Sequence, residues 1–497
     1  MQNILISLTC GILASLAFPG ANIFWLAWVA LAPVIYFMLR LPARSAFYCA
    51  AAFALGFMGS HLIWIKIFGV LPWILLTIFQ SLFILAFFFW GRFTVLRSRY
   101  WAGLFLIPSL WIITEWIRAR GMFGFTWGDL GYSQYKFLPV LQIASLAGVW
   151  GVSFLIVLFN TSLALFALSL TTKRNIKSAS AGLVLCVLAV AGVCIYGNAM
   201  LAMPVNGDRI FKTAVLQGNI SQDITGDYLY FMEKSWSVYT DLTLQAAKEG
   251  ANLVIWPETT VPGCTGLDSY VQGRLKNLSE KTGANLVVGG WDESLGQVYN
   301  TAFAFSRLGI ADSYAKRHLV PFGEFVPARK YLPFLQYYRV RADNTSPGSG
   351  YRVMQFDGHK VGTVICFESA FPEIARTMTV SGAEFLCIIT NDEWFGKSAA
   401  AEQHFSKSIV RSVENGRYTL RAAATGISAV IDPRGRVLAS LPEESKGMLR
   451  RDIMGVSRVT FYTRHGDWLV CISIIFAFFA TVAALLRPRS IRAEVEL

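Results

Sequence analysis

The chain has 497 residues, of which 54% are hydrophobic and only 15% are charged, and its formal net charge is +13. An ordinary soluble chain carries about 25% charged residues, so this composition argues against a protein that is soluble throughout. Nucleic-acid binding is a poor explanation of the positive charge, because no basic stripe or aromatic-basic motif accompanies it. Orientation in a membrane and attraction to anionic lipid explain it better.

Long apolar runs occupy most of the first 200 residues and recur once near the C-terminal end. A helix that crosses a bilayer needs about 20 mostly apolar residues. We count eight candidates: 3–19, 22–39, 46–66, 69–90, 101–117, 139–169, 178–200 and 467–486. The first is a secretory signal in an alternative interpretation, since Ser15-Leu16-Ala17 resembles a cleavage site. The basic start of a signal is missing and more spans follow, so we favour a retained helix.

These spans predict a membrane domain of seven transmembrane helices at 1–202, and an eighth helix with a cytoplasmic tail at 465–497. Basic residues gather in alternate loops: Arg40, Arg44, Arg92, Arg97, Arg99, Lys173, Arg174, Lys177, Arg487, Arg489 and Arg492. The opposite loops are poorer, although one holds Arg118, Arg120 and Lys136. The positive-inside rule therefore predicts a multi-pass protein of the inner (plasma) membrane with both termini in the cytoplasm. Residues 205–460 then lie on the periplasmic side.

Five polar residues fall in or near the spans: His61, Lys66, Glu115, Arg118 and Asp129. Ionisable groups inside a membrane are often functional. A structural role, such as a pair between Glu115 and Arg118 on one helix face, is the interpretation we favour. The stretch 121–137 is rich in glycine and aromatic residues and too polar to span, which suits a loop beside the lipid headgroups.

Residues 205–460 alternate between strand and helix patterns. Strands are expected at 212–220, 251–259, 284–291, 299–306, 361–368 and 384–392, with a hairpin at 427–441. Helices are expected at 227–248, 266–281, 372–380 and 402–416. Apolar strands separated by helices predict a layered α/β domain. Such folds place their chemistry where buried strands end at one edge of a sheet.

Polar side chains stand at several of these strand ends. Glu258 follows a strand in "IWPETTVPG", Lys316 and Glu324 lie in the Pro-bounded "YAKRHLVPFGEFVP", and "ICFESAF" carries Cys366 and Glu368. A thiolate is the nucleophilic form of cysteine, and a buried carboxylate can act as its base. A lysine supplies positive charge where an oxyanion develops. The set therefore suits acyl transfer through a thioester.

Each of these residues also has an ordinary interpretation. A cysteine at a strand end is often inert core, Glu258 could cap a helix, and Lys316 could be solvated. The other two cysteines of this part serve as comparisons: Cys387 in "EFLCIIT" is expected in the core, and Cys264 lies in a loop without an adjacent carboxylate. The eight cysteines have no regular spacing, which argues against a disulfide framework and a zinc site.

At these residues the sequence resembles the nitrilase (carbon–nitrogen hydrolase) superfamily, whose αββα sandwich carries Glu, Lys and Cys in that order. Within it, the resemblance is to the apolipoprotein N-acyltransferase family and covers nearly the whole chain. The shared stretches are "QGNI", "WPE", "HLVPFGEFVP", "ICFE", "NDEWFG", "QH", "ATGISAVIDPRG" and "GDW" before a last span. The resemblance implies a polytopic α-helical membrane domain of about eight spans plus a nitrilase-like domain at 205–460.

The resemblance also implies a mechanism. Glu258 would take the proton of Cys366, the thiolate would attack a phospholipid ester (the sn-1 chain of phosphatidylethanolamine), and Lys316 would stabilise the oxyanion. The α-amino group of a diacylglyceryl-cysteine apolipoprotein would then take the acyl group from the thioester. By the same resemblance, other residues support or lie near the site: Asn300, Glu324, Phe367, Glu368 and Trp394. No metal or cofactor is implied, and a monomer is the default.

Three departures from the family pattern bear on lipid gating rather than on the chemistry. Phe367 replaces a usual Tyr, Glu393 a usual Ala, and Gly226 lies where a Trp is often found; Trp236 is a candidate replacement for that Trp. Apolar loops around 322–338 are expected to keep water from the thioester. The alternatives are a membrane-tethered amidase that uses the same three residues, and a transporter or receptor whose external domain only binds.

Overall fold

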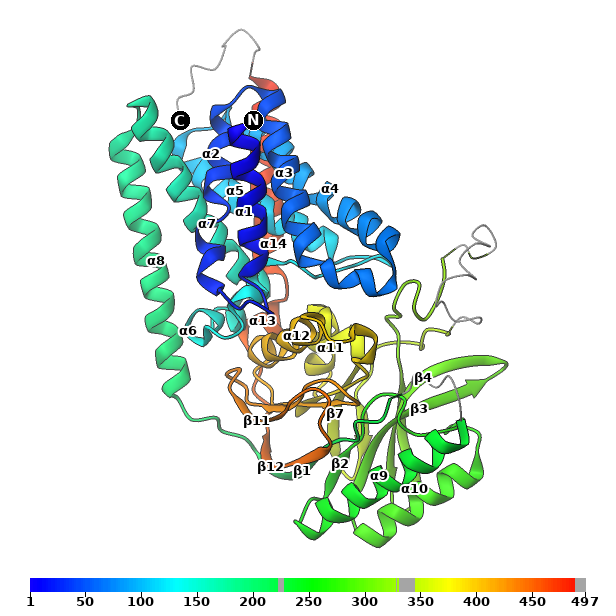
Figure 1. Cartoon of the computed structure of the whole chain (residues 1–497). Helices are drawn as coiled ribbons and strands as arrows, with labels where there is room; N and C mark the ends of the chain where they lie inside the picture. The colour runs from blue at the N-terminus through cyan, green and yellow to red at the C-terminus, as the bar shows by residue number, and fades with distance from the viewer. Residues whose placement is uncertain (222–227, 328, 330–344, 488–497) are drawn as a thin grey trace. The chain divides into compact units, whose positions relative to one another are not determined.

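The computed structural model describes residues 1–221, 228–327, 329 and 345–487. It divides into two compact units, which Figure 1 shows coloured by residue number. One unit comprises Met1–Met203 and His465–Leu497, and the other comprises Pro204–Arg464. Gly226, Arg489, Arg492 and most of the predicted shielding loop at 322–338 lie outside the described residues.

The first unit is helical. Within the described residues, five of its helices are long and apolar enough to cross a membrane: α4 (Val70–Val95), α5 (Tyr100–Arg118), α7 (Ala144–Thr172), α8 (Ile176–Ala202) and α14 (Trp468–Leu486). The remaining helices are shorter or less apolar: α1 (Gln2–Leu16), α2 (Ala32–Arg40), α3 (Ala43–His61) and α6 (Leu138–Leu141). The expected span 22–39 is divided into the 3-10 turn Phe24–Trp28 and α2. The number of eight crossings therefore stays a prediction.

The long helices differ in what their apolar side chains contact. Those of α5 and α7 are mostly buried inside the unit, whereas α4, α8 and α14 leave most of theirs exposed, among them Phe89, Ile195 and Phe479. Contiguous exposed apolar surface on helices of this length is typical of a bilayer environment, where the helix satisfies its own backbone hydrogen bonds. The composition that argued against a soluble protein is thus concentrated on these helix surfaces.

The polar residues of the first unit are paired differently from our expectation. Arg118 forms its buried ion pair with Asp129, not with Glu115. Glu115 instead accepts hydrogen bonds from Trp111 Nε1 at 2.6 Å and from the Leu130 amide at 2.8 Å. Much of the stretch predicted to lie beside headgroups, residues 126–135, is buried within the unit because it folds back onto these groups. The structural role predicted for these residues fits this arrangement.

The second unit contains two six-stranded sheets. The first has the order β12-β1-β2-β3-β4-β5 and the second the order β11-β10-β9-β8-β7-β6. Strands β1, β2 and β3 run parallel, as do β7, β8 and β9. The bounds are β1 (Arg209–Gln217), β2 (Leu253–Ile255), β3 (Asn285–Ser294), β4 (Gln297–Ser306), β5 (Gly309–Ala315), β6 (Met354–Phe356), β7 (His359–Ile365), β8 (Phe385–Thr390), β9 (Thr419–Ala423), β10 (Ser428–Ile431), β11 (Val437–Leu441) and β12 (Gly447–Gly455).

Helices cover the outer face of each sheet, and the inner faces pack on each other. Strand β1 lies against β9 and β10 of the other sheet. The first sheet is covered by α9 (Tyr228–Lys248) and α10 (Ser269–Thr282), and the second by α11 (Pro372–Val380) and α12 (Ala400–Asn415) (Figure 1). A short α13 (Phe461–His465) ends the unit. This is the layered α/β domain that the pattern predicts and the αββα sandwich that the resemblance implies, and it places the carboxyl ends of the central strands together.

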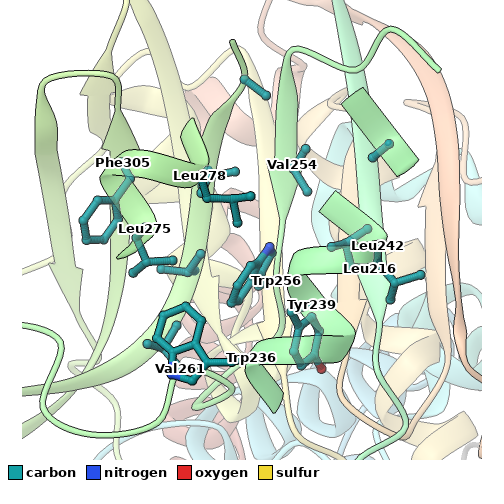
Figure 2. Close-up of a cluster of buried hydrophobic side chains, with 14 of the residues drawn as sticks. Leu216, Trp236, Tyr239, Leu242, Val254, Trp256, Val261, Leu275, Leu278 and Phe305 are labelled. Atoms are coloured by element: carbon teal, nitrogen blue, oxygen red, sulfur yellow. The ribbon is translucent and has the colours of Figure 1, made fainter. Parts of the chain in front are cut away.

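A large aromatic cluster joins α9 to the first sheet (Figure 2). The Trp256 ring stacks on Tyr239 with centroids 5.0 Å apart and meets Trp236 edge-on at 6.1 Å. Full burial of such side chains contributes about 2–3 kcal/mol each. Trp236 is therefore part of the core beneath the sheet, 4% exposed, and is not a loop tryptophan of the kind that the family pattern places near Gly226.

Candidate active site

Glu258 is placed by the end of β2. The strand stops at Ile255, and Pro257 and a left-handed Thr259 (φ +50°) turn the chain sharply around the carboxylate. Gly289 on the neighbouring β3 makes room for this turn, because a Cβ there would lie 2.6 Å from Glu258 Cα. Glu258 is 5% exposed. The sequence thus uses a proline and a glycine to bury one carboxylate at the edge of the sheet.

Lys316 follows β5 directly and lies beside two carboxylates. Its Nζ donates to Glu258 Oε1 at 3.2 Å and to Glu324 Oε1 at 2.9 Å. Its backbone N–H donates to the Asn300 carbonyl at 2.8 Å, which fixes the loop to β4. Burial alone would lower the pKa of Lys316, but the charges of Glu258 and Glu324 outweigh it and hold the pKa well above its usual value. Lys316 is therefore a permanent buried cation.

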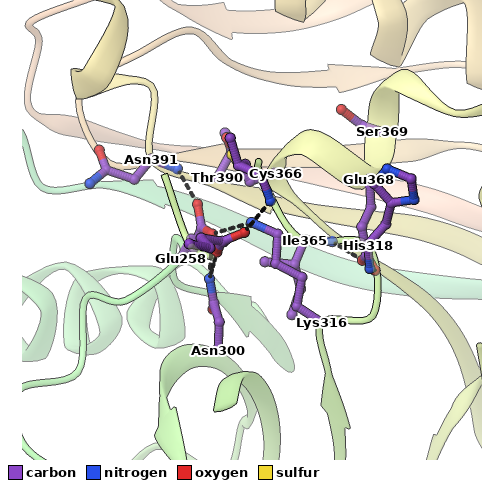
Figure 3. Close-up of polar contacts among 12 residues, drawn as sticks. Glu258, Asn300, Lys316, His318, Ile365, Cys366, Glu368, Ser369, Thr390 and Asn391 are labelled. Atoms are coloured by element: carbon purple, nitrogen blue, oxygen red, sulfur yellow. Dashed lines mark hydrogen bonds and ion pairs between the residues drawn. The ribbon is translucent and has the colours of Figure 1, made fainter. Parts of the chain in front are cut away.

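Asn300 and Asn391 complete the shell around the carboxylates (Figure 3). Asn300 Nδ2 donates to Glu258 Oε1 at 2.7 Å and to Glu324 Oε1 at 3.1 Å. Asn391 directly follows β8 in the second sheet, and its backbone N–H donates to Glu258 Oε2 at 2.8 Å. Glu324 Oε2 accepts from the Val320 amide at 2.8 Å. Glu258 therefore receives hydrogen bonds from both sheets, which fixes its orientation.

Cys366 directly follows β7 and begins the 3-10 turn Cys366–Ala370, with a left-handed φ of +53°. Such backbone is costly for a non-glycine residue and is often found at functional sites. Burial of the thiol and the nearby charge of Glu258 raise the pKa of Cys366 well above its usual value, against an opposing effect of Lys316. At neutral pH Cys366 is therefore a protonated thiol, influenced by the Glu258 carboxylate and the Lys316 ammonium. It can become a nucleophile only if a base removes its proton.

Glu368 holds the two chain segments of the site together and is fully buried. Its Oε1 accepts from the Tyr314 hydroxyl at 2.9 Å, the Arg317 amide at 2.9 Å and the His318 amide at 3.1 Å. Its Oε2 accepts from the Ile365 amide at 3.0 Å. One carboxylate thereby fixes the residue before Cys366 and the residues after Lys316. This geometry suits a supporting role rather than direct chemistry.

Two aromatic residues expected near the site differ in exposure. Phe367 is buried and packs on Phe371 with ring centroids 5.1 Å apart, next to the ring of His318 at 5.7 Å. Trp394 is 55% exposed in the short turn Glu393–Phe395. Burial and the charge of Lys316 lower the pKa of His318 to about 4, so its ring is neutral at neutral pH. Phe367 therefore lines the turn of Cys366, whereas Trp394 is a surface side chain.

The two comparison cysteines have no such surroundings. Cys387 is fully buried inside β8, which confirms its assignment to the core. Cys264 is partly exposed and forms an isolated bridge to Trp291. The structure thus brings Glu258, Lys316 and Cys366 together with Asn300 and Glu324, whereas their roles in a reaction stay predictions.

Sequence reasoning missed several polar residues around Cys366. They are Thr390 at the end of β8, Asn391 and Asp392 directly after it, His404 in α12 and Arg421 in β9, and all are buried. A signal was present, because "ITND" ends an apolar strand in the same way as "VICFE". Applying the strand-end rule to every central strand would have identified the first three. His404 lies inside α12 and Arg421 inside β9. A polar residue inside a helix or strand does not show by itself whether its side chain points to solvent or to the site.

The comparisons with known proteins agree with this division of the chain. The Carbon-nitrogen hydrolase family model matches residues 212–458, and the model of the Apolipoprotein N-acyltransferase N-terminal domain matches residues 10–162. The chain is 35% identical to an apolipoprotein N-acyltransferase of Geobacter metallireducens, over 97% of this chain and 95% of the relative. It is 30% identical to one of Methylococcus capsulatus, over 97% of this chain and 96% of the relative.

The chain is also similar to solved structures over about half of its length. An amidase mutant from Nesterenkonia sp. AN1 is 19% identical with a TM-score of 0.39 and covers 53% of this chain and 99% of its own. A carbon-nitrogen hydrolase from Helicobacter pylori is 18% identical with a TM-score of 0.37, over 56% of this chain and 96% of its own.

Proposed function

The chain belongs to the apolipoprotein N-acyltransferase family, and we propose that it moves an acyl chain from a phospholipid to the α-amino group of a diacylglyceryl-cysteine apolipoprotein. The observation that carries this proposal is the position of the Cys366 thiol within the field of Glu258 and Lys316. A thiol, a carboxylate and a buried cation together suit acyl transfer through a covalent intermediate. We expect the reaction to proceed in two half-reactions through a Cys366 thioester.

In the first half-reaction Glu258 takes the thiol proton while the sulfur attacks the ester carbonyl. The C–O bond of the ester breaks when the tetrahedral intermediate collapses. Glu258 then returns the proton to the departing lysophospholipid oxygen, and a thioester remains on Cys366. Positioned acid–base catalysis of this kind contributes about 10²–10⁴-fold. The raised pKa of Cys366 makes this proton transfer necessary.

In the second half-reaction the free amine of the acceptor attacks the thioester carbonyl. Glu258 takes the amine proton, the C–S bond breaks, and the thiolate of Cys366 recovers the proton. Lys316 stabilises the oxyanion in both half-reactions, and a donor of this kind contributes about 10²–10³-fold. Glu324 holds the Lys316 ammonium at 2.9 Å, and Asn300 orients the Glu258 and Glu324 carboxylates by hydrogen bonds of 2.7 and 3.1 Å.

Both proposed substrates are lipid-anchored, so the second unit must work beside a bilayer. The five apolar helices of the first unit supply an anchor of the right length. The basic loops favour cytoplasmic termini and a periplasmic catalytic unit at the inner membrane. Phosphatidylethanolamine is the donor we propose.

Intact-protein mass spectrometry tests the covalent step. We expect the purified protein, incubated with phosphatidylethanolamine, to gain the mass of one acyl group, and the Cys366→Ala variant to gain none. Peptide mapping should place the acyl group on Cys366. Cys387, the fully buried cysteine of β8, should carry none. Adding a synthetic diacylglyceryl-cysteine peptide should discharge the adduct and yield the N-acylated peptide.

The same experiment separates the alternatives. A tethered amidase would release free fatty acid or hydrolyse a small amide without using the amine acceptor. A binding protein would show no adduct at all and would keep its function in the Cys366→Ser variant. An unmodified wild-type protein under these conditions would overturn the proposed mechanism.

A further inference from the structure

A second group of buried polar residues lies against Cys366 and takes no part in the proton transfers described above. Asp392 follows β8, His404 lies in α12 and Arg421 in β9, and Ser369 belongs to the turn that begins with Cys366. None of the four is more than 3% exposed. Buried charges of this kind persist only where they are paired and hydrogen-bonded, so their arrangement calls for a structural or functional reason.

Asp392 is the centre of the group. Arg421 Nη2 donates to its Oδ2 at 2.7 Å, and His404 Nδ1 lies 2.8 Å from its Oδ1. Burial alone would raise the pKa of Asp392, but Arg421 and His404 outweigh burial and lower it, so the group is a carboxylate. Gly426 leaves the space that Asp392 fills, because a Cβ there would collide with the carboxylate. The site is therefore built around this one charge.

The far side of the His404 ring contacts the turn of the nucleophile. Nε2 lies 2.9 Å from Ser369 Oγ and 3.1 Å from the carbonyl oxygen of Cys366. The serine hydroxyl can form a hydrogen bond with either protonation state of Nε2, whereas the carbonyl oxygen accepts one only when Nε2 carries a proton. Burial and the charge of Arg421 lower the pKa of His404, so its ring is neutral at neutral pH and has a single N–H. With that proton on Nδ1 the ring donates to Asp392 and Nε2 accepts from the Ser369 hydroxyl, which holds the ring between Asp392 and the turn.

Thr390 provides a second route from Asp392 to Cys366. Its hydroxyl donates to Asp392 Oδ1 at 3.0 Å, and its side chain is within hydrogen-bonding reach of the Cys366 thiol. Thr390 is the last residue of β8, the parallel neighbour of β7. Asp392 therefore reaches the turn of Cys366 through His404 and Ser369, and the Cys366 thiol through Thr390.

We propose that Asp392, His404 and Thr390 form a positioning network that holds the strained turn of Cys366 so that its sulfur faces Glu258. A left-handed φ persists only where the surroundings enforce it, and Glu368 fixes the turn from the side of Lys316 alone. The network fixes it from the opposite side. This inference rests on the proposed use of Cys366 as a nucleophile.

The test measures how fast Cys366 reacts in the full-length protein. The variants are Asp392→Asn, His404→Gln, Thr390→Val and Thr390→Ser. The matched control is Glu414→Gln. Like Asp392, Glu414 is a buried carboxylate paired with an arginine; it lies in α12 and contacts Arg411 at 3.0 Å. We expect the acylation rate at saturating phospholipid to fall by up to ~100-fold in the first three variants. The phospholipid concentration at half-maximal rate should stay unchanged.

The threonine pair keeps the test decisive if Asp392→Asn fails to fold. Thr390→Val removes only the hydroxyl and Thr390→Ser restores it, so serine should recover most of the rate that valine loses. A role in packing alone predicts the opposite order, since valine keeps the shape of threonine. Equal rates in Thr390→Val, Thr390→Ser and Glu414→Gln would overturn the proposal.

Alkylation of Cys366 by iodoacetamide, followed by peptide mass spectrometry, separates this inference from the proposed function. The reagent needs no lipid and reports only how the thiol is presented. Slow alkylation in Asp392→Asn and Thr390→Val supports the network even if the wild-type protein forms no acyl adduct. Wild-type alkylation rates in both variants, together with a normal acyl adduct in the wild-type protein, overturn the network and leave the proposed function intact.

Discussion

At the scale of single residues, the chemistry depends on where one proton is held. Burial and the charge of Glu258 raise the pKa of Cys366, so the thiolate is scarce at neutral pH. A base that removes the proton during attack makes a low thiol pKa unnecessary. This differs from cysteine sites in which a cation makes the thiolate stable at rest.

Replacement of Glu258 tests this arrangement through its pH dependence. In Glu258→Gln we expect acylation at pH 7 to slow by ~100-fold or more. The remaining rate should rise about tenfold for each pH unit up to the pKa of Cys366, because only thiolate formed by the solvent can attack. The wild-type rate should change little between about pH 7 and 9. Intact-protein mass spectrometry gives the acylation rate of both proteins at each pH. A rate that does not change with pH in Glu258→Gln would show that Glu258 is not the base.

Lys316 has a structural role and a proposed catalytic role, and the two can be separated by substitution. Lys316→Met leaves two nearly buried carboxylates without a counter-charge, Glu258 at 6% and Glu324 at 14% side-chain exposure. Breaking such a group costs about 3–5 kcal/mol, so thermal unfolding should shift to clearly lower temperature. Adding Glu324→Gln removes one of the two charges and should restore part of the stability. Acylation should stay low in both variants, since neither supplies the oxyanion with a cation.

Recovery of acylation in the double variant would contradict this assignment. It would mean that Lys316 acts only as a counter-charge. Glu324→Gln alone is the control, because Lys316 then keeps its contact with Glu258 at 3.2 Å.

At the scale of elements, two strand ends are joined through one side chain. Glu368 accepts from the Ile365 amide at the end of β7 and from the Arg317 and His318 amides after β5. These strands belong to different sheets. The distance between Cys366 and Lys316 is therefore set by Glu368 and not by either sheet alone.

Hydrogen exchange measures this connection directly. In Glu368→Gln one oxygen becomes an NH₂ group, so some of these amides lose their acceptor, and a hydrogen bond to a charged group contributes about 1.5–3 kcal/mol. We expect at least ~10-fold faster exchange at Ile365, Arg317 and His318. Glu384→Gln is the matched control at the other end of β7, where Glu384 accepts from the Lys360 amide at 3.0 Å. Unchanged exchange at all three amides would show that these two chain segments keep their structure without the hydrogen bonds to Glu368.

Central elements were predictable from the sequence because their pattern is local. The buried parts of β1, β3, β7 and β8 are mainly apolar runs. The four predicted helices of the second unit, α9 to α12, each end within two residues of a glycine with positive φ. The strands without a prediction are β5, β6, β9 and β12. Strand β5 is half polar, and β12 alternates between exposed and buried residues at an antiparallel edge pairing.

The site was predictable for a related reason. Glu258 and Cys366 each follow a strand that the pattern predicts, and the strand-end rule needs no knowledge of the partners. Lys316 follows β5, which had no prediction, so only its Pro-bounded stretch and the family resemblance identified it. Arg421 was not predictable, because a buried arginine inside β9 becomes reasonable only once Asp392 is known to lie 2.7 Å away. Residues that act through a distant partner carry no local signal.

At the scale of the whole molecule, the first unit holds its last helix by a charge cluster. Asp467, just before α14, accepts from Arg120 at 2.5 Å, Trp116 Nε1 at 2.8 Å and Trp150 Nε1 at 3.1 Å. These donors come from α5, the residues after it, and α7. The C-terminal helix is therefore bound to the N-terminal helices although the 261 residues of the second unit, Pro204–Arg464, separate them in sequence.

The orientation of the two units across the membrane is the remaining prediction. Leu308, at the turn between β4 and β5, is 94% exposed, and Arg174 is exposed in the turn between α7 and α8. In a background lacking the partly or fully exposed cysteines, Cys194, Cys264, Cys366 and Cys471, a membrane-impermeant maleimide should label Leu308→Cys in intact spheroplasts. It should label Arg174→Cys only after lysis, because basic loops stay in the cytoplasm. Labelling of Arg174→Cys alone in intact cells would place the thiol chemistry in the cytoplasm, away from the periplasmic leaflet where the proposed acceptor must be acylated.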